Sequence, residues 1–204
     1  MRRYQIDIGD ISPAEYARAY ALLSAEKRAR IDRFRFADDK KRSLAGELLA
    51  RRAVAEECGA AEEEIVFAPG ANGKPYAPGF PVEFNVSHSG ALAVCAADGP
   101  GRPLGIDVER IEPISLSVAK RVCSAEELRA LFGHEPAREE FVRTEDPELL
   151  LRFYTLWTRK EAYVKCTGEG IARLDRPCPA TGARTFYSGE YVISVYQEEA
   201  DRQY

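Results

Sequence analysis

The order of hydrophobic and polar positions predicts a chain of short strands and capped helices. Residues 4–8 alternate between apolar and polar side chains, which is typical of a strand with one buried face. Serine or aspartate before an apolar-periodic stretch marks a helix start, and glycine after it marks the end. By these signals helices are expected at residues 12–23, from Ser24, and from Asp38 or Asp39 to Cys58 with Gly59 as the stop.

Three further strands are expected in the middle of the chain, at residues 65–67, 82–86 and 91–97. The last is rich in small residues and is expected to be buried. The stretch Ser87-His88-Ser89-Gly90 separates two of these strands and is predicted to form a turn. A loop at residues 100–103 is the expected boundary between an N-terminal lobe, residues 1–103, and a C-terminal lobe, residues 104–204.

The second half is dominated by a predicted long helix at residues 147–166. Asp146 can cap it, Pro147 suits its first position, and Gly168 can end it. Its neighbours are expected to be a strand at 104–111, a helix from the Ser124/Glu127 capping box to Leu131, a polar loop at 133–147, an irregular segment at 168–182, and a hairpin of 184–187 with 191–196.

Length and composition narrow the class of protein. The 204 residues are enough for one large domain or two small lobes, each with a core. A net charge of −4 argues against a general nucleic-acid binder. The N-terminus lacks the apolar run of a signal peptide, and no stretch approaches the roughly 18 apolar residues of a membrane span. The five cysteines are widely spaced, so we expect reduced thiols in a cytoplasmic protein.

One segment departs from the acidic balance of the chain. The stretch from Lys27 to Arg52 contains ten basic and four acidic residues, so it carries a net charge of +6. Concentrated positive charge attracts a polyanion, such as a phosphorylated ligand or an acidic protein. The alternative is a solvated helix face. Lys27, Arg30 and Arg33 fall at helical spacing on or near one side, which fits either interpretation.

Two carboxylates are placed unusually in the predicted strand at residues 104–111. Asp107 and Glu109 alternate with Ile106 and Val108, so the two acids face the same side. Like charges on one strand face repel unless solvent or a cation neutralises them. Acidic residues are poor strand formers, which weakens the interpretation as an exposed face. Oxygen ligands without nearby Cys or His suit Mg²⁺ rather than zinc.

A second candidate cluster lies on the predicted long helix. Residues four apart share a face of a helix, so Trp157, Glu161 and Lys165 form one stripe. Glu161 and Lys165 fit two interpretations: a surface ion pair, or a metal ligand beside a cation that binds phosphate. Trp157 is expected to pack rather than to take part in chemistry.

Two residues of the first half are ambiguous in the same way. Lys74 follows a turn, where lysines are usually solvated but where functional residues also occur. His88 is one of two histidines and is flanked by the hydroxyls of Ser87 and Ser89. A lone histidine near a strand end is more often structural than a ligand, although its polar neighbours favour a functional role.

Taken together, these residues resemble the 4′-phosphopantetheinyl transferases of the surfactin-type (Sfp-type) group. Four stretches match signatures of that family, and they occur in the family's order over most of the chain. The basic segment lies where the family carries its coenzyme-binding helix, whereas the region after Gly170 is short. The four stretches are Gly73-Lys74-Pro75, Phe84-Asn85-Val86-Ser87-His88-Ser89, Gly105-Ile106-Asp107-Val108-Glu109 and Trp157 to Lys165.

The resemblance implies a reaction and a set of site residues. Coenzyme A would donate its phosphopantetheine arm to a serine of an apo acyl carrier or peptidyl carrier protein, releasing adenosine 3′,5′-bisphosphate. Cleavage of a pyrophosphate requires a divalent cation, here Mg²⁺ with Mn²⁺ as the alternative. The implied metal ligands are Asp107, Glu109 and Glu161; the implied catalytic groups are Glu161 and Lys165; the implied coenzyme contacts are Lys27, Arg30, Arg42, Lys74, Ser87, His88 and Lys165.

The resemblance also implies the fold: α+β, with two similar lobes related by a pseudo-twofold axis, each a small antiparallel sheet packed with a long helix. The coenzyme would lie in a cleft between the lobes. We expect a cytoplasmic monomer without nucleic-acid or membrane partners. Two alternatives remain open at this point: a Mg²⁺-dependent hydrolase of a phosphorylated small molecule, and a catalytically silent module that binds coenzyme A.

Overall fold

The chain folds into two compact units, Met1–Leu104 and Gly105–Tyr204. The computed structural model describes residues 1–70, 73–168 and 182–198. Residues 169–181 of the predicted irregular segment, which include the fifth cysteine, Cys178, lie outside these residues. The four cysteines within them, Cys58, Cys95, Cys123 and Cys166, are free thiols.

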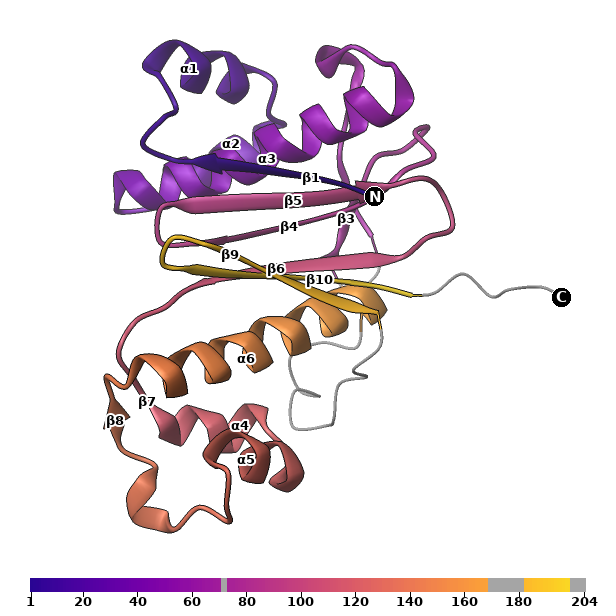
Figure 1. Ribbon diagram of the computed structural model, residues 1–204. Coiled ribbons are helices and arrows are strands. Elements are labelled where there is room, and N and C mark those ends of the chain that lie inside the picture. The colour runs from indigo at the N-terminus through magenta and orange to yellow at the C-terminus, as the bar shows by residue number, and fades with distance from the viewer. Residues whose placement is uncertain (71–72, 169–181, 199–204) are drawn as a thin grey trace, which may run out of the picture. The chain divides into compact units, whose positions relative to one another are not determined.

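A three-stranded antiparallel sheet with a long helix across it forms the first unit. The strand order is β1-β5-β4, with Tyr4 and Val86 both opposite Cys95. Helix α3 contacts all three strands, and Figure 1 shows it running along one face of the sheet. The elements are β1 (Arg2–Asp7), α1 (Pro13–Ala21), α2 (Ala25–Asp32), α3 (Ala37–Cys58), a 3₁₀ turn (Glu62–Glu64), β2 (Ala68–Pro69), β3 (Pro75–Tyr76), β4 (Glu83–Ser89) and β5 (Leu92–Asp98).

Small side chains explain how closely α3 packs on this sheet. All seven residues of β5 are buried, and Ala93, Ala96 and Ala97 are inaccessible to solvent. On the facing helix Ala45 and Ala53 are equally buried. Short side chains on both surfaces let the backbones approach and exclude water from the core. The prediction of a buried, small-residue strand at residues 91–97 is therefore confirmed.

The helix starts of the first unit follow the sequence signals except at α3. Ser12 forms a capping box with Glu15, and the Ser24 side chain accepts the backbone N–H of Lys27. Helix α3 instead begins after Phe36, which makes no side-chain cap. The predicted helix start at Asp38 or Asp39 is wrong, because both residues lie within the first turn. Acidic side chains there interact favourably with the positive end of the helix dipole.

Two strand predictions in this unit are also corrected. Residues 65–67 are not a strand, because the Ile65 carbonyl accepts a hydrogen bond from Arg51. The short ladder begins at Ala68, where β2 pairs with β3. Residues 87–89 do not turn: β4 continues to Ser89, which pairs with Leu92, and the reversal falls at Gly90, with φ 55°. The extended ladder with β5 provides more backbone hydrogen bonds than an earlier turn would.

The second unit repeats the combination of a three-stranded sheet and a long helix. Its strand order is β6-β10-β9, and β9 and β10 form an antiparallel hairpin. In Figure 1, α6 lies between this sheet and the short helices α4 and α5. The elements are β6 (Leu104–Arg110), β7 (Ile114–Ser115), a 3₁₀ turn (Leu116–Val118), α4 (Ala119–Val122), α5 (Ala125–Phe132), a 3₁₀ turn (Arg138–Glu140), β8 (Arg143–Thr144), α6 (Pro147–Thr167), β9 (Ala183–Ser188) and β10 (Tyr191–Gln197).

The ends of α6 are those predicted. The Asp146 carboxylate accepts backbone N–H groups of the first turn, Pro147 occupies the first position, and Gly168 ends the helix with φ 73°. The region 133–147, predicted as a loop, is more ordered: β8 pairs with β7, and Phe141 packs on Phe132 with ring centroids 5.3 Å apart. Burial of these aromatic rings holds the segment on the body of the unit.

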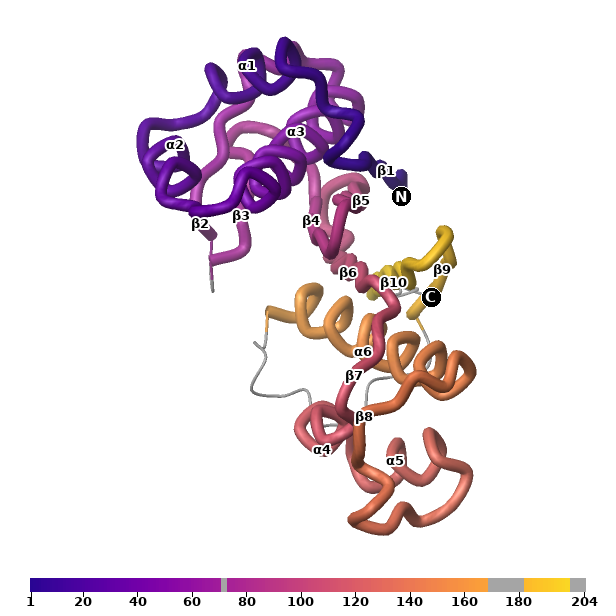
Figure 2. The backbone as a smooth tube through the Cα atoms, turned by 90° about the vertical axis from the view of Figure 1, so that its left-hand side faces the viewer, coloured from indigo at the N-terminus to yellow at the C-terminus, as the bar shows by residue number. Residues whose placement is uncertain are grey.

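The fold class is therefore α+β, with small sheets in which every assigned register is antiparallel. Figure 2 shows the same elements from the side, with α1 and α2 beside α3 in the first unit and α4 and α5 beside α6 in the second. None of the helices in the described residues has the length and apolar content needed to cross a membrane.

Candidate active site

Close approach of β6 to α6 creates the acidic cluster of the second unit. A Cβ atom on Gly105 would lie 2.0 Å from the Ala162 carbonyl oxygen and 2.6 Å from the Cys166 amide nitrogen. Only glycine is compatible with this spacing. Asp107 is two residues further along the strand, so it faces the same side as Gly105, toward α6. The missing side chain at position 105 thus lets the strand carboxylates meet the helix.

An ion pair joins the two elements at that point. The Lys165 ammonium lies 2.6 Å from the Asp107 carboxylate, and the Asp107 side chain is only 5% exposed. The interpretation of Asp107 as part of an exposed strand face is therefore wrong. A buried carboxylate loses hydration energy and requires a positive partner, which Lys165 provides.

Glu161 shares this environment. Burial raises the pKa of the Glu161 carboxyl above its ordinary value, and the nearby Asp107 carboxylate raises it further. The Lys165 ammonium and a hydrogen bond from the Trp157 indole act in the opposite direction. Trp157, Glu161 and Lys165, here called the α6 stripe, thus interact along one face of α6 and with Asp107 on β6. Two carboxylates that disfavour each other's charge provide hard oxygen donors for a divalent cation.

The third predicted ligand, Glu109, lies on the same strand side and is half-buried. No group of three or more His, Cys, Asp or Glu side chains within residues 1–70, 73–168 and 182–198 is arranged as a metal site. The structure therefore brings Asp107, Glu161 and Lys165 together, while the full set of three carboxylate ligands stays a prediction.

Aromatic packing fixes the Trp157 end of the α6 stripe. The Trp157 ring meets Phe153 edge-on at 5.2 Å and stacks on Tyr154 at 6.3 Å. The predicted packing role of Trp157 is confirmed, and its indole N–H has the additional role of a donor to Glu161. Lys160, which immediately precedes Glu161, is buried and forms an ion pair with Glu127 of α5. This contact ties α5 to the helix that carries Glu161.

A cationic cavity of about 260 Å³ lies in the first unit. Lys27 and Arg30, one turn apart on α2, line it together with His88 of β4. Phe84 and Val86 belong to the same strand face as His88 and are part of the apolar lining. Gly73 and Pro75, from the Gly-Lys-Pro stretch, also line the cavity. The cavity therefore combines positive side chains with an apolar surface, which suits an anionic ligand with an organic body.

A buried network supports one of these cations. Arg51 is 4% exposed and donates to the carbonyls of Leu22, Glu62 and Ile65 and to the Glu47 carboxylate, 3.1 Å away. Glu47 lines the cavity and lies 3.8 Å from the Lys27 ammonium. Glu47 and Arg51 were not among the predicted site residues. Their (i, i+4) spacing on a helix was the available signal.

The remaining predicted coenzyme contacts lie elsewhere in the first unit. Arg42 donates to the Gly90 carbonyl at 2.8 Å and pairs with Asp39. Lys74 donates to the Leu104 carbonyl at 3.1 Å. Ser87 is buried and, as the neighbour of His88 on an extended strand, faces the other side of the sheet. The cavity lining thus includes Lys27, Arg30 and His88, but not Arg42, Lys74 or Ser87.

Comparison with known proteins assigns both halves of the chain to related groups. Residues 10–99 match a family described as "4′-phosphopantetheinyl transferase, N-terminal", and residues 103–201 match the "4′-phosphopantetheinyl transferase superfamily". The chain is 41% identical over 184 residues to the 4′-phosphopantetheinyl transferase psf-1 of Bacillus pumilus, covering 86% of this chain and 74% of that protein.

Two other relatives carry the same functional name. The 4′-phosphopantetheinyl transferase Sfp of Bacillus subtilis (strain 168) is 33% identical over 186 residues, which cover 91% of this chain and 76% of that protein. HetI of Nostoc, also named a 4′-phosphopantetheinyl transferase, is 34% identical over 161 residues, covering 76% of this chain and 63% of that protein. The similarity therefore extends over both the cationic cavity and the acidic cluster.

Proposed function

Because the chain belongs to the surfactin-type 4′-phosphopantetheinyl transferases, which transfer phosphopantetheine to carrier proteins, we propose specific roles for its two residue clusters. The acidic cluster of the second unit carries the chemistry, and the cationic cavity of the first unit binds the phosphates of coenzyme A. The observation that carries the proposal is the contact of Asp107 with Lys165 beside a Glu161 carboxyl whose pKa is raised.

Asp107, Glu109 and Glu161 are the proposed ligands of Mg²⁺, with Mn²⁺ as an alternative. The donor set fits these ions, because it consists of carboxylate oxygens. When bound, the ion neutralises the charge that develops on the pyrophosphate. Burial of Asp107 supports the proposal, since a buried carboxylate beside a second one is stabilised by added positive charge.

Glu161 and Lys165 are the proposed catalytic residues. The oxygen of the carrier serine forms a bond to the phosphorus of the phosphopantetheine, and the P–O bond to adenosine 3′,5′-bisphosphate breaks. Glu161 accepts the serine proton, directly or through a water. Lys165, which now neutralises Asp107, stabilises negative charge on a phosphate oxygen of the leaving group.

The proposed contacts to coenzyme A divide into two groups. Lys27, Arg30 and His88 are supported by their common position in the cationic cavity. Charge-assisted hydrogen bonds from these side chains would hold phosphate oxygens. Arg42, Lys74 and Ser87 remain assigned by family resemblance, since they do not line that cavity.

The arrangement of the units is also a proposal from the family resemblance. We propose that two similar lobes, residues 1–103 and 104–204, are related by a pseudo-twofold axis with coenzyme A in a cleft between them, and that the protein is a monomer. The four free thiols of the described residues support a role in the cytoplasm. A crystal structure of the protein with coenzyme A would test the arrangement, and a coenzyme bound to one lobe alone would contradict it.

One experiment tests the chemistry. The protein is incubated with coenzyme A, Mg²⁺ and an apo carrier protein, and intact mass shows whether the carrier gains the phosphopantetheine arm. Asp107→Asn and Glu161→Gln should each slow transfer by about 100-fold or more, because each removes charge that acts at the pyrophosphate. Removing divalent ions with a chelator should stop transfer.

Glu112→Gln is the matched control, because Glu112 is an exposed carboxylate just beyond β6. It should leave the transfer rate unchanged. Near-normal transfer by Asp107→Asn would refute the metal assignment. Release of adenosine bisphosphate without an acceptor would instead favour the hydrolase.

A further inference from the structure

A groove on the second unit has no role in the proposed reaction. It measures about 360 Å³ and is formed by α5, α6 and β9. Its apolar lining includes Leu131, Leu151, Leu156 and Tyr187. Of these, Leu151 and Tyr187 have 38% and 58% of their surface exposed. Large apolar side chains gathered at one exposed site mark interaction surfaces. We call this site the α5–α6 groove.

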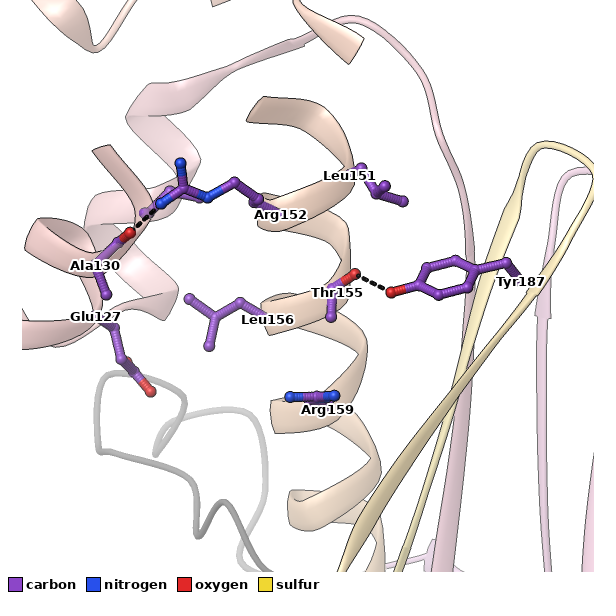
Figure 3. Close-up of a pocket in the computed structure, with 9 residues that line it drawn as sticks. Glu127, Ala130, Leu151, Arg152, Thr155, Leu156, Arg159 and Tyr187 are labelled. Atoms are coloured by element: carbon purple, nitrogen blue, oxygen red, sulfur yellow. Dashed lines mark hydrogen bonds between the residues drawn. The ribbon is translucent and has the colours of Figure 1, made fainter. Parts of the chain in front are cut away.

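Positive charge accompanies this apolar surface. Arg152 and Arg159 belong to the lining, and its carboxylate, Glu127, is already paired with Lys160. Counting that lysine, the local net charge is +2 on a chain whose overall charge is −4. Figure 3 shows Arg152 directed toward α5, where it donates to the Ala130 carbonyl. Arginine and tyrosine are both enriched among the residues that dominate binding at protein interfaces.

The groove has the dimensions of a short helix. Leu151, Thr155 and Arg159 are spaced four apart on α6, so this side of the groove extends for about 12 Å. On the other side Thr155 meets Tyr187 of β9, with the two hydroxyl oxygens 3.2 Å apart (Figure 3). Rows of side chains four apart form ridges between which the side chains of a second helix pack. A helix with apolar residues on one face and acidic residues beside them complements this surface in shape and charge.

The groove and the α6 stripe lie on opposite sides of α6. Thr155 and Arg159 are each two residues from a stripe member, Trp157 and Glu161 respectively. Two residues correspond to about 200° around a helix. A partner in the groove therefore leaves Glu161 and Lys165 accessible, and the acceptor serine of a carrier protein is presented on the other side of the helix.

We propose that the α5–α6 groove binds an acidic amphipathic helix of a partner protein other than the carrier, so that the transferase is tethered while its α6 stripe stays open. The assignment of the catalytic side rests on the proposed function. The groove itself is defined by the geometry of α5, α6 and β9.

The test uses the full-length protein and a synthetic helical peptide of about 15 residues, roughly 22 Å long. The peptide carries leucines along one face and glutamates beside them, and fluorescence anisotropy reports binding. Two comparison peptides have the same composition in scrambled order, or lysine in place of glutamate. The acidic amphipathic peptide alone should bind, and binding should weaken strongly in about 1 M salt, where the Debye length is about 3 Å.

Groove variants give the decisive comparison. Arg152→Glu and Leu151→Asn should each weaken peptide binding by about 10-fold or more, which corresponds to about 1.4 kcal/mol. Arg143→Glu is the matched control, because it makes the same charge change at an exposed residue of β8 in the same unit, and it should bind normally. The groove variants should keep the parental melting temperature and the parental rate and KM with apo carrier protein.

The proposal would be overturned by failure of the acidic peptide to bind, by equal binding of the lysine peptide, by equal weakening by Arg143→Glu, or by a raised KM for apo carrier protein in the groove variants. The last result would mean that the carrier itself occupies the groove. A dimer in solution that the groove variants dissociate would identify a second copy of this chain as the occupant and would also refute the proposed partner. Loss of transfer by Asp107→Asn bears only on the proposed function, so the two can fail separately.

Discussion

Single residues decide the electrostatics of the acidic cluster. Asp107 is almost completely buried, and its stability there depends on Lys165, whose side chain is 28% exposed. Glu161 is part of the same cluster and already has a raised pKa. Removing one of these charges therefore changes the electrostatic energy of the others. The effects of paired substitutions on the free energy of unfolding should not be additive.

Lys165→Met should lower the free energy of unfolding by about 2 kcal/mol, less than for a fully buried pair because Lys165 is partly exposed. The loss arises because a buried carboxylate is left beside Glu161 without its cation. Adding Asp107→Asn to this variant should restore most of the loss. Urea denaturation of the two single variants and the double variant measures this coupling, and strictly additive effects would show that the pair is energetically unimportant.

At the scale of elements, two contacts set the positions of the site residues. Gly105 brings β6 against α6 in the second unit. In the first unit Arg51 joins the end of α1, helix α3 and the turn after it. Both residues act on the backbone of other elements, and neither belongs to the predicted set of ligands.

Gly105→Ala should destabilise the protein by about 3 kcal/mol, because its Cβ would overlap the backbone of α6 at 2.0 Å. Transfer activity should fall as well, since β6 and Asp107 must move away from α6. Gly99→Ala is a fair comparison, because nothing lies within 4 Å of its added Cβ. Thermal melts and transfer rates of the two variants decide the point; similar values for both would contradict the close-packing argument.

Arg51→Met should cost about 3 kcal/mol of stability, because it leaves the Glu47 carboxylate and three carbonyls without their common donor. Arg52→Met changes the next residue, which is exposed, and should be nearly neutral. Chemical denaturation provides the measurement. Equal stability of the two variants would mean that the network around Arg51 adds nothing.

At the scale of the whole molecule, each unit has its own hydrophobic core. A buried cysteine in each unit can show whether that core is intact. Burial raises the pKa of the Cys95 thiol to about 12 in the first unit and that of Cys123 to about 11 in the second. Thiols with such pKa values stay protonated at neutral pH and react slowly with alkylating reagents. Half-buried Cys58 should therefore be labelled before either of them.

The raised pKa of the Cys95 thiol predicts a loss of stability at high pH. The unfolded chain releases the Cys95 proton above about pH 9, whereas the folded protein keeps it up to about pH 12. The folded state is therefore disfavoured by about 1.4 kcal/mol per pH unit within that window. Cys95→Ala should make the decline shallower when unfolding is followed by urea titration at several alkaline pH values. An unchanged slope would indicate that water reaches the thiol.

The sequence by itself determined the local features of this protein. Capping residues and glycine stops placed most helices, and short motifs identified the family and the residues of the acidic cluster, because these signals lie within a few neighbouring positions. Predictions from the sequence were wrong where contacts with distant residues override the local conformational preference. Arg51 donates a hydrogen bond to the carbonyl of Ile65, where a strand was predicted. Pairing with β5 keeps Ser87, His88 and Ser89 extended, where a turn was predicted.

Only the tertiary structure decided which predicted residues meet. It joined Asp107 to Lys165 across 58 positions of sequence, gathered Lys27, Arg30 and His88 in one cavity, and excluded Ser87 from it. It also revealed the supporting roles of Gly105 and Glu47 and the groove beside Tyr187. The physical reason is that burial and Coulomb interactions depend on distances in space, which spacing along a chain specifies only within a single helix or strand.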